Sequence, residues 1–546
     1  MSAASERIVV VGGGIAGLAS AALLARDGHR VTLLEARNEV GGRAGTWERR
    51  GFRFDTGPSW YLMPEVFDHF FRLFGTSAVE ELDLVQLDPG YRVHADGYEE
   101  PLDLRATREG NVALFESVEP GAGSALERYL DSAQETYEVA VRRFLYTNFD
   151  DLRGFAAPEV LRRAGRLARL LTTPLDRFAS RAVRDRRLRQ VLGYPAVFLG
   201  SSPSATPAMY HLMSHMDLEE GVFYPQGGFG ELISRIAAIA ERVGVELVTN
   251  AEVQAIELTD DPAPSVTGVR YVDAAGNTHR VAADRVVSAA DLHHTETKLL
   301  PRHAQTYPES WWERRVSGPG AVLAMLGVRG AVPGLAHHTL FFTEDWDANF
   351  DRIFGDDPEI PDPASFYVCM PSATDPSVAP AGDTNLFILI PVPADVSIGR
   401  GGEDGTGDRL VEAAADRAIA RIAAATGTPD LARRITVRRT VGPADFAEDL
   451  HSWRGGALGP AHTLRQSAFL RGSNRSRRVR GLLYAGGSSV PGIGLPMCLI
   501  GAENVLKRVR GDRSSGPLPE PAEGAVRGSA ATHVPPAPRS PARDGG

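Results

Sequence analysis

Three consecutive glycines follow a short apolar run near the start of the chain, where residues 7–36 read RIVVVGGGIAGLASAALLARDGHRVTLLEA. The run Ile8–Val11 is rich in β-branched residues, which predicts a strand buried on both faces of a parallel sheet. The glycines begin the pattern G-x-G-x-x-G, and an alanine-rich helical stretch and a second apolar strand follow it. This order of strand, glycine turn, helix and strand predicts a βαβ unit that binds a dinucleotide.

Each glycine of this pattern has its own steric role. Gly12 permits the tight turn, Gly14 lets a pyrophosphate approach the backbone, and Gly17 allows the helix to pack closely on the strand. The helix that begins near Ile15 directs free N–H groups and its positive end at the phosphates. Glu35 ends the second strand, where a carboxylate accepts a hydrogen bond from a ribose 2′-OH and repels a 2′-phosphate. The motif therefore predicts NAD or FAD and argues against NADP.

A second glycine turn helps to decide between NAD and FAD. Gly41, Gly42 and Arg43 follow the acid within a few residues, and an arginine can pair with a phosphate. A simple NAD dehydrogenase does not need this turn. Residues 7–60 resemble the N-terminus of flavoproteins of the amine-oxidase and carotenoid-desaturase superfamily. The resemblance implies that Glu35, Gly42, Arg43 and the first glycines hold the adenosine and pyrophosphate of FAD.

The C-terminal region repeats the order of strand, glycine loop and helix in GLLYAGGSSVPGIGLPMCLIGAENVLKRV (481–509). The strand is predicted over 482–484 and the helix over 495–509. Because a helix N-terminus stabilises anionic groups, this loop suits a flavin pyrimidine ring or a phosphate. Taken alone, the loop is also compatible with a turn that serves only packing.

Together with YPQGGFGEL, VSAAD and QSAFLRGSNR, these motifs resemble the bacterial and fungal type of phytoene desaturase over residues 7–508. The resemblance implies that the backbone of Val253 meets the adenine. It also implies that four positions lie beside the isoalloxazine ring: Gly487, Ile493, Gly494 and Met497. The sequence departs from the family in AGGSSVPGIG, which has serines where related chains commonly carry Thr or His next to the proline.

The predicted fold class is α/β, with a discontinuous Rossmann-like FAD-binding domain of the glutathione-reductase type. A mixed α+β substrate domain with a helical, membrane-facing region interrupts it. The FAD-binding domain is predicted over 1–75, 223–297 and 471–510, and the substrate domain over 76–222 and 298–470. Residues 511–546 are rich in Pro, Gly, Ser and Ala, so they bury too little apolar surface to repay the entropy of ordering. This tail is predicted to be disordered.

The resemblance also implies a reaction. Carotenoid desaturases remove a hydride equivalent and a proton from adjacent carbons of a C40 polyene, with FAD as acceptor, so the expected reaction converts phytoene to lycopene. The stretch NFDDLRGF (148–155) has an acid and an arginine where related desaturases carry them. Asp151 is the predicted proton acceptor or cation stabiliser, and Arg153 orients it; a solvated charged loop is the alternative. Quinone or oxygen is the expected electron acceptor.

Three other functions remain open at this point. A flavin-dependent carotenoid cis–trans isomerase and a carotenoid oxygenase or ketolase would use the same scaffold. A flavin-binding partner without turnover, part of a carotenoid-synthesis complex, belongs to a different class. The mass of the product distinguishes these functions from desaturation.

The substrate's insolubility predicts a peripheral membrane protein. Transfer of a C40 chain into water costs about 30 kcal/mol, so the enzyme should collect its substrate from a membrane. The stretch APEVLRRAGRLARLLTT (157–173) has an apolar face opposite Arg162, Arg166 and Arg169, which is typical of an interfacial helix and also of a packed surface helix. The chain has no apolar run long enough to span a bilayer and no secretory signal. We expect a cytoplasmic protein, peripheral on the inner face of the membrane.

Composition argues against two other kinds of site. The net charge is −10, which gives no bulk attraction to nucleic acid. Cys369 and Cys498 are the only cysteines. The pairs His293–His294 and His337–His338 lack the i, i+4 spacing of a helical zinc site, and no Cys–His cluster accompanies them in the sequence. No metal is expected.

Overall fold

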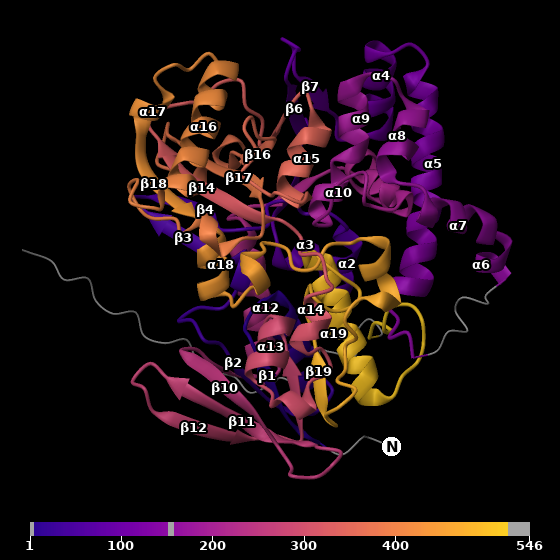
Figure 1. Cartoon of the computed structure of the whole chain (residues 1–546), viewed down its shortest axis with the longest axis vertical. Helices are drawn as coiled ribbons and strands as arrows, with labels where there is room; N and C mark the ends of the chain where they lie inside the picture. The colour runs from indigo at the N-terminus through magenta and orange to yellow at the C-terminus, as the bar shows by residue number, and fades with distance from the viewer. Residues whose placement is uncertain (1–4, 151–157, 522–546) are drawn as a thin grey trace, which may run out of the picture.

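The structure is a computed structural model that describes residues 5–150 and 158–521. Its lower half in Figure 1 contains a five-stranded parallel sheet with the strand order β19-β13-β1-β2-β9. The strands are β1 (Arg7–Val11), β2 (Arg30–Leu34), β9 (Glu246–Val248), β13 (Arg285–Ser288) and β19 (Leu482–Tyr484). Strand β1, helix α1 (Ile15–Arg26) and strand β2 follow one another, so the predicted βαβ unit is confirmed.

This parallel sheet is buried on both faces, as its apolar strands predict. On one face, Ile8 and Val10 share a core with α1, α12 (Phe229–Arg242) and α19 (Leu495–Arg510). On the other face, Val9 and Val11 share a core with an antiparallel three-stranded sheet. That second sheet and the following helix are β10 (Ala251–Leu258), β11 (Val266–Asp273), β12 (Thr278–Ala282) and α13 (Leu292–Lys298). All these elements except Lys298, the last residue of α13, fall within the three segments predicted to form the FAD-binding domain.

The upper half of Figure 1 contains a seven-stranded mixed sheet with the order β18-β14-β17-β16-β15-β6-β7. Its strands are β6 (Tyr91–Ala95), β7 (Leu102–Leu104), β14 (Gly320–Val328), β15 (His338–Phe342), β16 (Phe366–Cys369), β17 (Thr384–Val392) and β18 (Ile435–Val441). Every residue of β14 is buried, and alternate residues enter two different cores. One core includes helix α16 (Arg409–Ala425), and the other includes the helices that follow β7.

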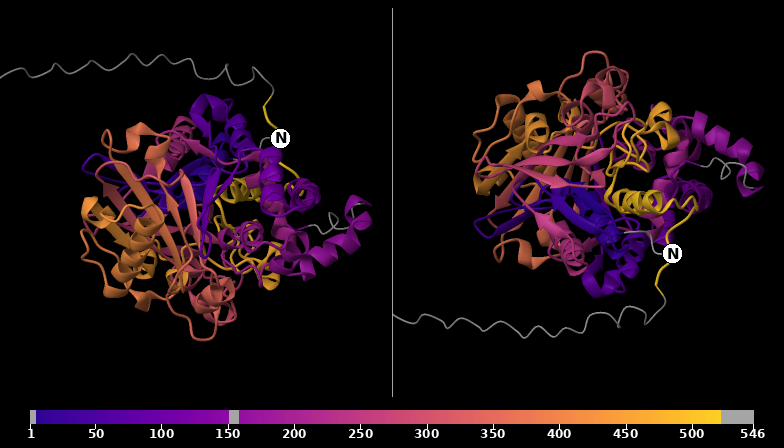
Figure 2. Two further views of the ribbon diagram at one scale, coloured as in Figure 1. Left: turned by 90° about the horizontal axis from the view of Figure 1, so that it is seen from above. Right: turned by 90° about the horizontal axis from the view of Figure 1, so that it is seen from below.

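The helices that follow β7, only some of which reach that core, lie on the right side of Figure 1. They are α4 (Arg108–Val118), α5 (Ala122–Ala140), α6 (Pro158–Arg162), α7 (Ala164–Thr172), α8 (Leu175–Ala182), α9 (Arg186–Gly193), α10 (Pro195–Phe198) and α11 (Met213–His215). The remaining α-helices of the described residues are α2 (Pro64–Leu73), α3 (Ala78–Glu81), α14 (Glu309–Trp312), α15 (Trp346–Phe354), α17 (Leu431–Arg434) and α18 (Pro443–Asp449). Both views in Figure 2 show α6 and α7 extending from the side of the molecule.

Two short strand pairs connect the halves. The hairpin of β3 (Thr46–Arg49) and β4 (Phe52–Asp55) belongs to the predicted FAD segment, yet β4 packs against β17 of the seven-stranded sheet. Phe52 and Phe54 are buried in the core of that sheet. Strands β5 (Leu84–Gln86) and β8 (Phe223–Pro225) pair where the chain leaves and re-enters the FAD-binding unit.

The structure differs from two predictions about chain segments. The helix predicted over 157–173 is divided at Arg163, whose φ of −103° and ψ of 4° end the α-helical geometry between α6 and α7. The predicted disordered tail begins too early, because Leu518 is buried and its N–H donates to Glu503 of α19. The buried ammonium of Lys507 explains this order, since it donates to backbone oxygens of residues 146 and 514.

Within residues 5–150 and 158–521, no helix is both long enough and apolar enough to cross a membrane.

Candidate functional site

The first glycine turn has the close packing that the motif requires. Gly12 has a φ of 98°, which side chains rarely adopt, and its N–H donates to the oxygen of Leu34 at 2.8 Å. A Cβ on Gly17 would lie 1.9 Å from the oxygen of Gly12, so only glycine lets α1 approach the turn.

Gly14 shows that this turn fits a phosphate ligand. Its φ of −70° suits any residue, and a Cβ there would come no closer than 4.0 Å to Gly41 and Gly42. The protein's own conformation and packing therefore do not require a glycine. Gly14 is also the N-cap of α1 and has no side-chain cap, so the first N–H groups of that helix remain for a ligand. A pyrophosphate close to this backbone accounts for both features.

The carboxylate of Glu35 is fixed beside this turn. Its Oε2 accepts from the N–H of Gly13 at 2.6 Å, and its Oε1 accepts from Arg37 at 2.9 Å. The backbone oxygen of Glu35 also accepts from the N–H of Ala251, which brings the start of β10 to the end of β2. Val253 follows two residues later on β10. The predicted adenosine contacts of Glu35 and Val253 are thus close to one another in the fold.

The second glycine turn touches the first. Gly41 donates its N–H to the oxygen of Gly13 at 2.9 Å, and a Cβ on Gly42 would lie 3.2 Å from the Cα of Gly14. Arg43 follows them, keeps part of its side chain exposed, and donates to the hydroxyl of Ser452 at 2.6 Å. The protein atoms around its guanidinium displace water and lower the pKa of Arg43, and the carboxylate of Asp291 opposes this effect. A guanidinium has five N–H donors, so this bond leaves donors for an anionic group.

The C-terminal glycine loop precedes α19. Gly492 and Gly494 have φ of 146° and 115°, and Gly494 is the N-cap of the helix. A Cβ on Gly487 would meet only atoms at 3.8 Å or more, so Gly487, like Gly14, leaves room for a ligand. Ile493 comes just before the N-cap, with its Cα 3.8 Å from that Cβ position, and Met497 lies in the first turn of α19. The loop therefore offers exposed backbone and a helix N-terminus to the same ligand.

Sequence analysis missed Arg471, which shapes this loop. Its side chain is buried, and it donates to the oxygen of Gly487 at 2.5 Å and to that of Pro460 at 3.1 Å. Burial lowers its pKa to about 10. The residue lies in QSAFLRGSNR, but nothing in that stretch distinguishes it from the chain's other arginines.

A group of six rings, missed as well, lies in the core of the seven-stranded sheet. We call it the aromatic set: Trp60, Tyr91, Tyr194, Phe198, His338 and Tyr367. Trp60 is its centre, because its ring centroid lies 4.6–6.1 Å from the other five. Leu199 connects the set to the C-terminal glycine loop, since its oxygen accepts from the N–H of His462, which in turn packs against Gly492.

Asp217 is a buried acid beside this set. Its Oδ2 accepts from the hydroxyls of Tyr194 at 2.6 Å and Tyr91 at 3.0 Å. Its Oδ1 is buried and has no hydrogen-bond partner among the described residues. Removal from water raises the pKa of Asp217 to about 7, which the two tyrosine hydrogen bonds only partly offset.

The predicted catalytic residues Asp151 and Arg153 lie outside the described residues. Asp150, the last described residue before them, accepts from Arg508 at 2.7 Å and lies 3.5 Å from Arg475. Arg508 is in the last turn of α19, at the opposite end from the glycine loop. The contacts of Asp150 therefore give no support for a place beside the flavin.

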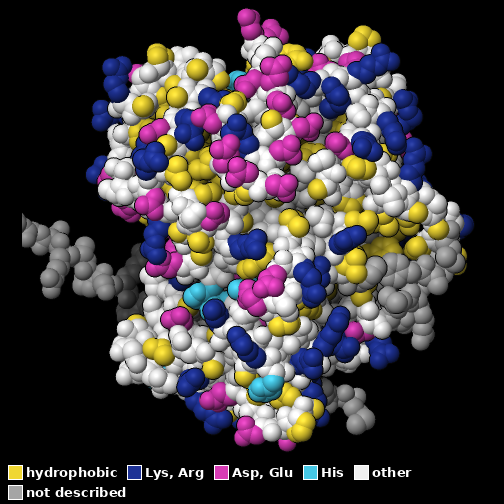
Figure 3. Space-filling view, in the orientation of Figure 1, with side chains coloured by type: hydrophobic (Ala, Val, Ile, Leu, Met, Phe, Trp, Pro, Cys, Tyr) yellow, Lys and Arg dark blue, Asp and Glu magenta, His cyan; other side chains and the backbone are white. Residues whose placement is uncertain are grey.

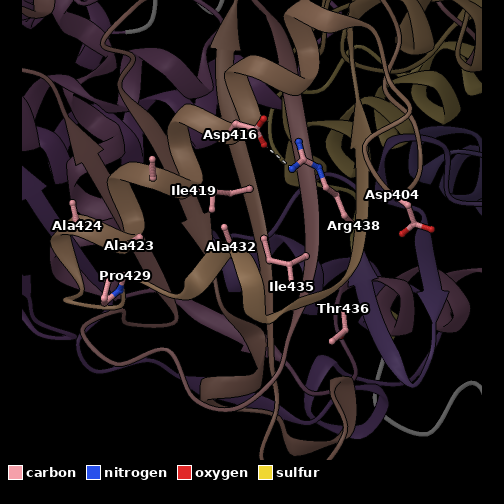
Figure 4. A pocket seen from close by; sticks show the side chains of 11 residues that line it. Asp404, Asp416, Ile419, Ala423, Ala424, Pro429, Ala432, Ile435, Thr436 and Arg438 are labelled. Carbon is pink, nitrogen blue, oxygen red and sulfur yellow. Dashed lines mark hydrogen bonds and ion pairs between the residues drawn. The ribbon is translucent and has the colours of Figure 1, made fainter.

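A hollow of about 870 Å³ lies elsewhere, along α16, α17 and β18 (Figure 4). Two of its charged side chains pair with each other, as the 2.6 Å bond from Arg438 to Asp416 shows. It is on the α16 side of the seven-stranded sheet, whereas the aromatic set belongs to the core on the opposite face. We assign it no role in the reaction.

Comparisons with known proteins agree with this architecture. Residues 15–500 match the family model described as flavin containing amine oxidoreductase. A putrescine oxidase bound to putrescine has a TM-score of 0.56 and 16% identity, covering 93% of this chain and 98% of the other. Cyclohexylamine oxidase from Brevibacterium oxydans has a TM-score of 0.56 and 14% identity, with 93% and 99% covered. The chain belongs to the flavin-containing amine oxidoreductases, and it is an FAD-dependent oxidoreductase.

More similar relatives define the branch of that family. The chain is 41% identical over 503 residues to the carotenoid 3,4-desaturase of Haloarcula japonica, covering 92% of this chain and 97% of the relative. It is 35% identical over 516 residues to the zeta-carotene-forming phytoene desaturase of Myxococcus xanthus, with 93% and 95% covered. It therefore groups with the carotenoid desaturases, as the sequence motifs predict, and the prediction of FAD is confirmed.

Proposed function

We propose that this protein introduces conjugated double bonds into a C40 carotenoid. The observation that carries the proposal is the 41% identity to a carotenoid 3,4-desaturase along almost the whole of both chains. That relative favours the 3,4 bond as the site of reaction. A relative named phytoene desaturase, at 32% identity, and one named zeta-carotene-forming phytoene desaturase, at 35%, make phytoene the second candidate substrate, with the predicted conversion to lycopene as the second candidate reaction.

The protein's part is to bind the polyene, keep water out and accept a proton. Bound FAD supplies the two-electron acceptor. Trp60 and Phe198, the two half-buried rings of the aromatic set, offer apolar surface that suits a conjugated chain, and Leu199 joins them through His462 to the C-terminal glycine loop. Released protons need a base, and two carboxylates are candidates for it: Asp151, with Arg153 orienting it, and Asp217. We favour Asp217, because its unpartnered Oδ1 lies in a dry site beside the aromatic set.

The source of the substrate is a membrane surface to which the protein binds peripherally, on the cytoplasmic side. Hydrophobic side chains gather over α7 on the right of Figure 3. The 3₁₀ turn Ala208–Leu212 contacts α7, and its Tyr210 packs 5.7 Å from His462. Beyond His462, three apolar side chains are 44–47% exposed: Val316, Leu464 and Leu470. Val316 and Leu470 line a hollow together with Arg314, Arg315 and Arg465. Such a mixture of apolar and basic side chains suits an anionic lipid surface.

Product analysis tests this proposal. The chain is expressed in cells that accumulate phytoene and, separately, in cells that accumulate lycopene. Each desaturation step removes two hydrogen atoms and shifts the pigment absorption to longer wavelength. An unchanged formula with altered geometry would indicate an isomerase, added oxygen would indicate an oxygenase or ketolase, and no product would indicate a partner without turnover. Quinone and oxygen are then compared as electron acceptors.

A further inference from the structure

We propose that His337, His338 and Cys369 form a metal site that binds one Zn²⁺ ion. His338 begins β15, and its direct partner across the antiparallel ladder is Cys369, the last residue of β16. His337 immediately precedes β15. One ligand atom from each of the three side chains lies within 4.8 Å of the other two. All three residues are buried.

The sequence shows no Cys–His cluster beside these histidines, and no metal is expected from it, but strand pairing brings a cysteine to them in the fold. The pairing of β15 with β16 brings Cys369 opposite His338 across a long stretch of chain. A spacing rule for helical zinc sites cannot detect this arrangement, because it compares positions on one element.

The two imidazoles are held in the manner of metal ligands. Hydrogen bonds join the Nδ1 of His337 to the hydroxyl of Thr374 at 2.8 Å, and the Nδ1 of His338 to that of Tyr367 at 2.6 Å. Both Nε2 atoms are buried and have no hydrogen-bond partner among the described residues. Histidines that bind metals commonly use one nitrogen for the ion and anchor the other through a hydrogen bond. A cation between the two Nε2 atoms would satisfy both.

The surrounding charges also suit a cation. Burial lowers the pKa of both histidines, so they are neutral and can donate lone pairs. The carboxylate of Asp375 acts on His337 and that of Asp55 acts on Cys369, so two acids lie near the cluster. Burial raises the pKa of Cys369 to about 12. When zinc binds, the S–H bond breaks, a zinc–sulfur bond forms and one proton passes to solvent.

The geometry and ligand types match zinc. Zinc bonds of about 2.0–2.3 Å in a tetrahedral arrangement place ligand atoms roughly 3.3–3.8 Å apart. Small side-chain rotations bring ligand atoms within 4.8 Å of one another to that spacing. Two imidazoles and one thiolate form a borderline-soft set that suits zinc better than Mg²⁺ or Ca²⁺. A bound ion would fasten β15 to β16 directly under Trp60, since His338 stacks on Trp60 at 4.6 Å.

The test is a metal analysis of the full-length, flavin-loaded protein. Protein from zinc-supplemented cells should contain about one zinc per chain, because so closed a site fills during folding. Cys369→Ser and His338→Gln should each lose it, and Cys498→Ser, which changes the other cysteine, should retain it. Wild-type zinc far below one per chain, or equal zinc in wild type and Cys369→Ser, would overturn the proposal.

A second measurement needs no folded variant of the cluster. Protein produced in cobalt-supplemented medium should show the intense near-ultraviolet absorption of a thiolate bound to Co²⁺, and Cys498→Ser should keep it. Cobalt bound without that absorption would come from surface histidines, such as His294 and His451, which stack at 4.0 Å. That result would also overturn the proposal.

Discussion

Replacing Gly14 by alanine should separate cofactor binding from folding. In the flavin-free protein the new methyl group meets no atom closer than 4.0 Å, and the φ of −70° is favourable for alanine. Alanine restricts the unfolded chain, which stabilises by roughly 0.4–1 kcal/mol, but it is a slightly poorer N-cap than glycine. These effects oppose each other, so the stability of the flavin-free protein should change by less than about 1 kcal/mol.

Binding of FAD should respond quite differently. The methyl group occupies the space through which the pyrophosphate approaches the backbone. Overfilling a packed site typically costs about 1–3 kcal/mol, which weakens binding by roughly 5- to 150-fold. Titration of flavin-stripped protein with FAD measures the dissociation constant, and thermal unfolding of the same sample measures the stability.

Substitutions at two further glycines serve as controls for Gly14→Ala. Gly17→Ala should destabilise the flavin-free protein as well, because its Cβ would lie 1.9 Å from the oxygen of Gly12. Gly165→Ala in α7 meets no atom within 4 Å, so it should leave FAD binding unchanged and raise helix stability slightly. If Gly14→Ala binds FAD as tightly as wild type, the pyrophosphate does not lie at this turn and the reasoning fails.

Three other predictions concern the acids and the basic surface. Glu35→Arg should abolish FAD binding, measured by flavin absorbance, because it places a cation where the ribose hydroxyls need an acceptor; retained flavin would contradict the motif assignment. The pKa of Asp217 is raised from 3.8 to about 7, so between these pH values the folded protein holds a proton that the unfolded chain has lost. The free energy of unfolding should therefore fall by about 4 kcal/mol as the pH rises from 4 to 7. Asp217→Asn should remove this slope from the pH dependence of unfolding and lower turnover roughly 10²-fold. If only Asp151→Asn loses turnover, Asp151 is the proton acceptor instead. Replacing Arg162 and Arg169 by glutamate should release the protein from anionic liposomes in a sedimentation assay, and added salt should release the wild-type protein in the same way. Arg166 is left in place because it pairs with Glu135. Unchanged sedimentation would exclude α7 from the membrane contact.

The nucleotide-binding part of the fold could be predicted because its signals are local. Gly12, Gly14 and Gly17 specify a turn whose backbone needs no distant partner, and Glu35 lies one helix and one strand away. The contact between the turns at Gly14 and Gly42 follows from the same βαβ geometry. Such features are fixed within some forty residues of sequence.

The remainder of the site depends on pairings across the whole chain. Trp60 meets Tyr194 and Tyr367 only because the hairpin β3–β4 packs on the seven-stranded sheet. Arg471 becomes distinctive only when burial places it against Gly487. The division of the arginine-rich helix at Arg163 has a related cause, since Arg163 and Arg166 both turn to the carboxylate of Glu135 on α5.

The central claim is that this chain oxidises a carotenoid and reduces its bound FAD. The most direct measurement mixes flavin-loaded protein with carotenoid in liposomes under anaerobic conditions, in the absence of any other acceptor. The account predicts that the flavin absorbance bleaches in a single turnover and that an equal amount of carotenoid with two fewer hydrogens appears. Gly14→Ala, with little bound flavin, should yield correspondingly little product. A carotenoid that keeps its formula while the flavin stays oxidised, with both phytoene and lycopene as substrate, would contradict the account.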